Sequence, residues 1–243
     1  MNRPFTPLGI LGAMPEEIEQ LLQALADGRV ENRAGVEIHS GTLAGIPVLI
    51  AQSGVGKVNA AAAAQTLLLQ GVRGLLFTGV AGTVDPELNV GDLVVCEDAV
   101  QHDVDVTALG YRPGEVPGQP LAWRADPELV QLAEDAARTA LDGVTVKRGR
   151  VASGDQFVAS EEHTGRIARE FSALCVEMEG AAVAQVCARA GIPFAIIRSI
   201  SDSADGDARL SFREFTDLAA GQAKRVVLAL CGRLAGGGAG SPA

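Results

Sequence analysis

The chain has 243 residues, 47% of them hydrophobic, which is enough for one large α/β domain with a sizeable core. Acidic residues outnumber basic ones by 30 to 20, and no basic run or basic–aromatic stretch is present, which argues against a nucleic-acid partner. No stretch approaches the roughly 18 consecutive apolar residues of a membrane span, and residues 1–7 lack the apolar core of a signal peptide. The four cysteines form no CxxC pair, so we expect a cytoplasmic protein without structural zinc.

Apolar runs and helical patterns alternate along the chain. In the first half the predicted elements are, in order, strand Leu8–Leu11, helix Pro15–Asp27, strands Val36–Ser40 and Pro47–Gln52, helix Asn59–Leu69, and strands Gly74–Thr78 and Leu93–Val100. After the polar segment His102–Pro120 follow helix Pro127–Leu141, strand Thr145–Val151, helix Glu161–Phe171, strand Ser172–Val176, helix Met178–Ala190, strand Pro193–Ile200 and helix Ser211–Leu234.

This alternation predicts an α/β fold, a single-domain three-layer sandwich whose mixed, mostly parallel central sheet is flanked by helices. We expect the domain to span residues 1–235 and the tail, residues 236–243, to be disordered. Ligands of such folds bind at the C-terminal ends of the strands. Small or polar clusters follow the predicted strands at five places, which are Gly12–Glu17, Gly79–Gly82, Ser153–Phe157, Glu177–Glu179 and Ser201–Asp205.

Three of these clusters contain the carboxylates that could act in catalysis. Glu17 lies in the first turn of a helix, Glu177 and Glu179 flank a methionine at a strand-to-helix junction, and an apolar strand ends close to Asp202. Each also has a structural interpretation, because acids favour helix N-termini and aspartate often caps a turn. If they converge on one pocket, they suit glycosidic cleavage. There one acid protonates the leaving group, one base activates water, and a third anion holds the ribose hydroxyls.

Other residues form no competing site. His39, His102 and His163 are scattered, and no Cys-His or Ser-His-Asp pairing is visible, so we interpret the histidines as surface or structural residues. Gly54–Lys57 looks faintly like a phosphate loop but lacks the full P-loop pattern. We therefore expect neither a metal nor a cofactor.

Several stretches carry a joint resemblance. They are Gly9–Glu17, Ser53–Ala61, Thr78–Gly82, His102–Tyr111, Ser153–Phe157, Val176–Glu179, and Ser201-Asp202 with Leu210–Phe212. Together they resemble the 5′-methylthioadenosine/S-adenosylhomocysteine nucleosidase family, in the purine nucleoside phosphorylase-like superfamily, and they fall in family order over nearly the whole chain. The resemblance implies hydrolysis of the N-glycosidic bond of adenine nucleosides with a sulfur-bearing 5′ group, in methionine salvage and methyl-cycle recycling.

The resemblance also implies a role for individual residues. Glu17 would be the base that deprotonates the attacking water, and Arg198 would help to hold that water. Asp202, held by Ser201, would protonate adenine N7. The other expected substrate contacts are Glu179 on the ribose hydroxyls, Met178 against the sugar, Phe157 stacked on adenine, the backbone of Val158 at the adenine edge, and Val55, Val80, Ala81, Gly82 and Phe212 elsewhere in the pocket.

A second subunit would complete the pocket in this family. The resemblance places four residues in the 5′ alkylthio site across a homodimer interface, namely Val106, Leu109, Tyr111 and Pro117. The segment His102–Pro120 also carries more apolar surface than a free loop should expose. We therefore expect a homodimer with shared active sites.

The sequence departs from the family pattern at Val80, where relatives often carry Ser, and at Leu109, where an aromatic is common. The nearest alternative is a phosphorylase of the same superfamily. However, Phe77 occupies the place of its phosphate-binding arginine, and Lys57-Val58 replaces its Pro-Ser. A futalosine-type nucleosidase and a non-catalytic nucleoside-binding protein are further alternatives. The ranking of methylthioadenosine, S-adenosylhomocysteine, 5′-deoxyadenosine and aminofutalosine as substrates stays open.

Overall fold

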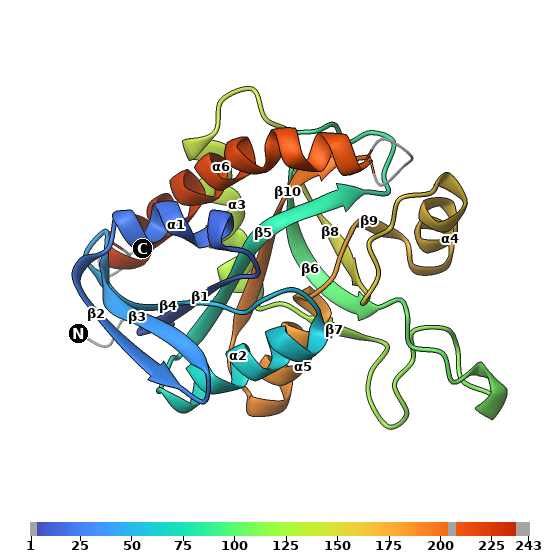
Figure 1. Cartoon of the computed structure of the whole chain (residues 1–243), viewed down its shortest axis with the longest axis horizontal. Coiled ribbons are helices and arrows are strands. Elements are labelled where there is room, and N and C mark those ends of the chain that lie inside the picture. The colour runs from blue at the N-terminus through green and yellow to red at the C-terminus, as the bar shows by residue number, and fades with distance from the viewer. Residues whose placement is uncertain (1–3, 204–207, 237–243) are drawn as a thin grey trace, which may run out of the picture.

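The computed structural model describes residues 4–203 and 208–236 (Figure 1). Its helices are α1 (Pro15–Gln23), α2 (Lys57–Leu69), the 3-10 turn η1 (Thr107–Leu109), α3 (Pro127–Ala140), α4 (Glu161–Phe171), α5 (Gly180–Ala190) and α6 (Ala208–Gly236). Its strands are β1 (Leu8–Gly12), β2 (Ala26–Arg33), β3 (Val36–Leu43), β4 (Ile46–Gln52), β5 (Gly74–Thr83), β6 (Leu93–Gln101), β7 (Ala122–Arg124), β8 (Val146–Ser153), β9 (Ala173–Glu177) and β10 (Phe194–Asp202).

Strand β5 is the centre of the sheet, because it pairs with three other strands. It pairs in parallel with β1 and β10, and its last residues, Gly82 and Thr83, pair antiparallel with β9. Strand β10 also pairs with β6, β6 with β8, and β8 with β9. The five strands β5, β10, β6, β8 and β9 therefore close into a ring. From β1 the sheet continues through β4 and β3 to β2. The closed ring brings the ends of β5, β9 and β10 together.

The predicted mixed α/β sandwich is confirmed. Among the described residues, five strand pairings are parallel and five are antiparallel. The antiparallel share is larger than the sequence predicted, because the edge strands β2 and β3, the short β7, and the two contacts that close the ring all pair in this way.

Helices cover both faces of the sheet. Helix α6 runs across one face beside α1 and α3, while α2 and α5 pack against each other on the other face (Figure 1). Ala60, Ala63 and Ala64 are buried on α2, and Ala181 and Ala184 are buried on α5. These small side chains let the two helices pack closely beneath the strand ends.

The predicted first helix was too long. Helix α1 ends at Gln23 rather than Asp27, and the following residues form β2, which is exposed along nearly its whole length. Because β2 lies at the sheet edge and buries almost none of its side chains, it shows no apolar alternation that could have predicted it. The three-residue strand β7 was also missed.

Two central strands extend beyond their predicted ends. β5 continues from Thr78 to Thr83 and β10 from Ile200 to Asp202, so polar residues expected after the strands are their last members. Both extensions are almost completely buried, because they lie where the ring closes.

At the C-terminus, Gly236 is the last residue of α6, and the remainder of the tail predicted to be disordered, residues 237–243, lies outside the described residues. Within the described ranges, none of the helices combines the length and the apolar character that crossing a bilayer requires.

Candidate active site

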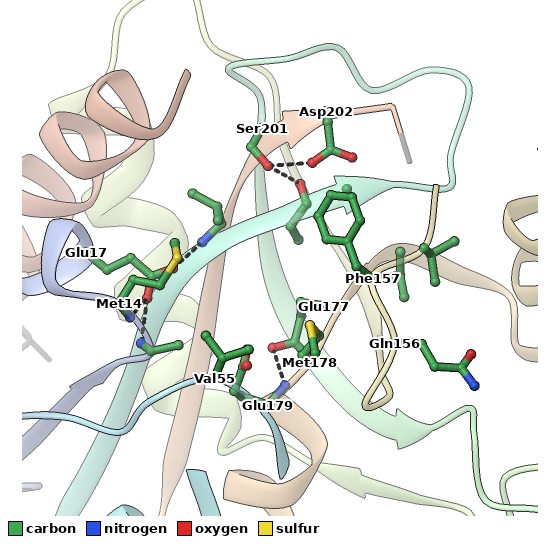
Figure 2. A pocket seen from close by; sticks show the side chains of 16 residues that line it. Met14, Glu17, Val55, Gln156, Phe157, Glu177, Met178, Glu179, Ser201 and Asp202 are labelled. Atoms are coloured by element: carbon green, nitrogen blue, oxygen red, sulfur yellow. Dashed lines mark hydrogen bonds between the residues drawn. The ribbon is translucent and has the colours of Figure 1, made fainter. Parts of the chain in front are cut away.

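A cavity of about 280 Å³ lies where β5, β9 and β10 end, beside the start of α1 (Figure 2). Eleven of the predicted site residues line it, namely Glu17, Val55, Val80, Ala81, Gly82, Phe157, Val158, Met178, Glu179, Ser201 and Asp202. The lining also contains residues that were not predicted, which are Ala13, Met14, Gln156, Val176 and Glu177. The fold therefore gathers most of the predicted site at one edge of the sheet.

Glu17 is buried and held by the backbone. Its Oε2 accepts hydrogen bonds from the N–H groups of Ala13 (2.5 Å) and Met14 (2.9 Å), and its Oε1 accepts one from Val80 (3.0 Å). These bonds use three of the four lone-pair positions of a carboxylate and leave one on Oε1. Gly79 makes the approach possible, because a Cβ there would collide with Oε1. Burial raises the pKa of Glu17, against a nearby guanidinium and the backbone donors.

Arg198 lies behind the cavity and is 1% exposed. Its Nε and Nη2 donate to Oε2 of Glu177 at 3.3 and 2.6 Å, and its Nη1 donates to the carbonyl of Ile197 at 3.1 Å. The guanidinium carbon lies 4.1 Å from the ring centre of Phe77. Burial alone would lower the pKa of Arg198, but the charges of Glu177 and Glu17 raise it. Phe77 is thus covered by the cation instead of facing the cavity.

Glu177, the last residue of β9, received no role from the sequence. Besides Arg198, its carboxylate accepts hydrogen bonds from the hydroxyl of Ser153 and from the N–H groups of Glu179 (3.2 Å) and Gly180 (2.8 Å). It therefore caps the N-terminus of α5 and fixes the backbone of Glu179. The Glu-Met-Glu stretch was the sequence signal for this residue, but it does not tell a ligand-facing carboxylate from a structural one.

Glu179 lines the cavity and is 6% exposed. Its Oε1 accepts a hydrogen bond from the N–H of Gly56 at 2.7 Å, and its own N–H donates to Glu177, the bond drawn between these two residues in Figure 2. Gly56 has a φ of +96°, a value that glycine adopts without strain. Burial, followed by the charge of Glu177, raises the pKa of Glu179 to about 8.

Asp202 is the last residue of β10 and is 3% exposed. The hydroxyl of Ser201 donates to its Oδ2 at 2.7 Å and lies 3.4 Å from the carbonyl of Ala81. In Figure 2 this pair stands across the cavity from Glu177 and Glu179. Ser201 therefore fixes the orientation of a fourth buried carboxylate at the same cavity.

The outer wall of the cavity is apolar and partly open. Phe157 is 50% exposed and Val55 is 49% exposed, whereas Val158 is buried and Met178 is half-buried. Both exposed side chains line the cavity, so a ligand bound there would cover them.

The four residues predicted to come from a partner subunit do not line the cavity of their own chain. They lie on the segment after β6, which reaches away from the body of the molecule and carries η1 (Figure 1). Leu109 is 73% exposed and Tyr111 is 37% exposed. The predicted contact from Phe212 concerns a side chain that lies outside what the structure describes.

The Gly54–Lys57 turn does not offer a phosphate cradle. The N–H of Gly56 is bonded to Glu179 and the N–H of Lys57 to Oδ1 of Asp155, each at 2.7 Å. Among the described residues, no group of three or more His, Cys, Asp or Glu side chains is placed to hold a metal ion. The titratable side chains that line this cavity are the carboxyl groups of Glu17, Glu177, Glu179 and Asp202.

A mixed sheet that closes on itself, with acidic residues at its strand ends, agrees with the family comparison. The model of the phosphorylase superfamily matches residues 7–231. The chain therefore belongs to the phosphorylase superfamily, whose model spans nearly all of the domain described above.

Relatives narrow the assignment. The 5′-methylthioadenosine/S-adenosylhomocysteine nucleosidase of Halalkalibacterium halodurans is 41% identical over 94% of this chain and 99% of its own. The Neisseria meningitidis protein of that name, solved with methylthio-immucillin-A, is 40% identical with a TM-score of 0.89 over 93% of this chain and 98% of that one. A futalosine hydrolase mutant of Helicobacter pylori is 36% identical with a TM-score of 0.88 over 92% and 97%. Within the superfamily, the chain belongs to the 5′-methylthioadenosine/S-adenosylhomocysteine nucleosidase family.

The crowding of Glu177 and Glu179 predicts an unusual titration. In protein labelled with carbon-13 at the glutamate carboxyls, one signal should titrate near pH 8 and should disappear in Glu179→Gln. Glu177→Gln removes the neighbouring charge and should move that midpoint down, since Glu177 raises the pKa of Glu179. An ordinary midpoint for Glu179, near ~4.3, would contradict this description of the site.

Proposed function

We propose that this chain hydrolyses the N-glycosidic bond of 5′-methylthioadenosine and S-adenosylhomocysteine, releasing adenine and a 5′-substituted ribose. One observation carries the proposal. In a member of this family, Glu17, Glu179 and Asp202 come from three separate parts of the chain and are buried around one cavity. By this reaction the enzyme would serve methionine salvage and the recycling of methyl-transfer by-products.

In this proposal Glu17 is the general base. The remaining lone-pair position on its Oε1 can accept a proton from a water molecule, and the backbone bonds fix the direction in which it points. Its raised pKa makes it a stronger base than an exposed glutamate. Val80 serves it through its backbone N–H, so the absence of the serine hydroxyl found in relatives leaves this contact unchanged.

Asp202 is the proposed general acid, which protonates adenine N7 as charge develops on the leaving base. The side chain is buried, and the Ser201 hydroxyl donates to Oδ2, which fixes the orientation of the carboxyl group at the cavity. This role requires the carboxyl group itself, because an amide could hydrogen-bond to N7 but could not transfer a proton.

The other walls of the cavity suit the remaining parts of the nucleoside. Glu179 is proposed to bind the ribose hydroxyls, with Met178 against the sugar. Phe157 would stack on adenine and the Val158 backbone would read its edge, while the further contacts assigned to the pocket wall are Val55, Val80, Ala81 and Gly82. Arg198 is proposed to act from behind the wall, because its positive charge stabilises the ionised form of Glu17.

The cavity suits water better than phosphate as the nucleophile. A phosphate dianion needs cationic donors to offset its desolvation. Arg198 is already bonded to Glu177 and stacked on Phe77, and the base Glu17 would repel an anion. We therefore propose hydrolysis rather than phosphorolysis.

A futalosine-type nucleoside is the second candidate substrate. The similarity to the Helicobacter pylori futalosine hydrolase mutant favours it, and the acid–base set would serve it equally. The difference between these substrates lies at the 5′ group. The residues proposed to surround the 5′ group come from another subunit. A further nucleoside, 5′-deoxyadenosine, would bind in the same pocket.

We propose a homodimer in which each subunit completes the pocket of the other. Exposed apolar side chains at the cavity, on α2 and on the segment after β6 support this assembly. They are Val55, Val58, Leu69, Leu109, Tyr111 and Phe157. In this dimer Val106, Leu109, Tyr111 and Pro117 would line the 5′ alkylthio site.

We also propose a cytoplasmic location, since all four cysteines are buried free thiols, as a reducing compartment favours.

The products separate hydrolysis from phosphorolysis. Methylthioadenosine should give adenine and free methylthioribose, at the same rate in phosphate-free buffer and in millimolar phosphate, because water needs only the base Glu17 and no anion site. Mass spectrometry of the sugar and absorbance of released adenine are the measurements. A sugar 1-phosphate, or a rate that rises in proportion to phosphate, would exclude the hydrolase mechanism.

The proposed dimer predicts that assembly and activity are lost together. Leu109→Glu should place a charge in the interface, so sedimentation should show monomers and turnover should fall by at least ~10-fold. Val30→Glu is the matched control, because Val30 is 60% exposed on the edge strand β2. A wild-type monomer at assay concentration with full turnover would refute the shared-site dimer.

A further inference from the structure

A partly buried ion pair lies just outside the cavity and takes no part in the proposed reaction. Lys57, the first residue of α2, donates from Nζ to Oδ1 of Asp103 at 2.6 Å. The two side chains are only 16% and 13% exposed. Lys57 Nζ also donates to Oε1 of Gln101 at 3.0 Å, and Gln101 donates to Gln185 on α5 at 2.8 Å. Such a network has a structural cost, because two charges leave water to form it.

The pair joins three separate parts of the chain. Oδ2 of Asp103 accepts from the N–H of Asp155 at 2.9 Å, and Oδ1 of Asp155 accepts from the N–H of Lys57 at 2.7 Å. Burial alone would raise the pKa of Asp103, but the bonds from Lys57 and Asp155 lower it, so the side chain is a carboxylate. Asp103 thus holds the start of α2 and the loop after β8 in one closed ring of hydrogen bonds.

Both arms of this ring lead to the cavity. The N–H next to that of Lys57, on Gly56, donates to the carboxylate of Glu179. A Cβ on Gly56 would lie 3.1 Å from Oδ1 of Asp155, so the turn and the loop are in close contact. On the other arm, Asp155 stands two residues before Phe157. The direction of the Gly56 N–H therefore depends on where Asp103 holds Lys57 and Asp155.

We propose that Asp103 is a positioning residue for ribose recognition, acting through Lys57 and the Gly56 N–H on the carboxylate of Glu179. The inference rests on the proposed function, in which Glu179 binds the ribose hydroxyls. It also gives the Gly54–Lys57 turn a role, since its backbone donors orient a side-chain carboxylate instead of binding a phosphate.

Asp103→Asn tests the inference, because an amide offers one acceptor oxygen where the carboxylate offers two. The kcat/KM for methylthioadenosine should fall by at least ~10-fold, whereas the kcat/KM for its 2′-deoxy analogue should fall by less than ~3-fold, since effects that act on one contact are not additive. Equal losses on both substrates would assign Asp103 a purely structural role and overturn the inference. Unchanged kinetics on both would overturn it as well.

Two further variants sharpen the comparison. Asp98→Asn breaks an ion pair with Arg150 of similar burial on β6 and should leave the preference between the two substrates unchanged. Lys57→Met combined with Asp103→Asn replaces the whole pair by neutral side chains, which is tolerated better than the loss of one partner. This double variant should fold and should show the same reduced preference for the ribose hydroxyl.

One readout does not depend on turnover. In protein labelled with nitrogen-15 glycine, the amide proton of Gly56 should move upfield in Asp103→Asn, because its bond to Glu179 weakens, and should stay in place in Asp98→Asn. An unmoved Gly56 signal would overturn the inference even in an active enzyme. If the wild-type protein cleaves no nucleoside but Asp103→Asn still shifts the Gly56 signal, the proposed function is refuted and the positioning contact is kept.

Discussion

Four buried carboxylates line one cavity with the buried guanidinium of Arg198 behind it, and the rest of the site depends on how their charge is balanced. Glu17, Glu177, Glu179 and Asp202 are each at most 7% exposed, and Arg198 forms an ion pair with Glu177 and acts through its charge on Glu17 and Glu179. An uncompensated buried ion costs several kcal/mol. Backbone N–H groups therefore donate to Glu17 and Glu177, and burial raises the pKa of Glu17 and that of Glu179. A site that raises the pKa of its carboxyl groups is suited to acid–base chemistry.

The closed ring of strands makes this crowding possible. β5 pairs with β1, β10 and β9, so the ends of separate chain segments meet without a long loop between them. Glu177 secures the junction, because it bonds β10 through Arg198 and also caps α5. Glycine supplies the remaining space, since Gly79 lets the Glu17 carboxylate approach the backbone of β5. The positions of the carboxyl groups are thus set by the pairing of the strands as well as by the residues themselves.

The sequence predicted the order of the elements and the edge of the sheet where the cavity lies, because apolar runs ending in small or polar residues mark buried strands. It could not predict β2, whose exposed residues carry no pattern, or the closure of the ring, which depends on pairings between distant strands. It also could not separate the structural role of Glu177 from the ligand-facing role of Glu179, since a capping carboxylate and a ligand-facing one look alike in sequence. The sequence could not predict how the 5′ subsite is built, for another reason. Its proposed residues, such as Leu109, do not line the cavity of their own chain, and only the proposed dimer would give them a role there.

The central claim is that these buried carboxylates perform proton transfer, and Asp202→Asn tests it most directly. Asparagine keeps the shape and the bond to Ser201 but cannot give up a proton to adenine. Single-turnover cleavage of methylthioadenosine and calorimetric binding of adenine should be measured on the same folded sample. The account predicts a loss of at least ~100-fold in the cleavage rate while adenine still binds. Cleavage at a near-normal rate by a correctly folded Asp202→Asn protein would contradict it.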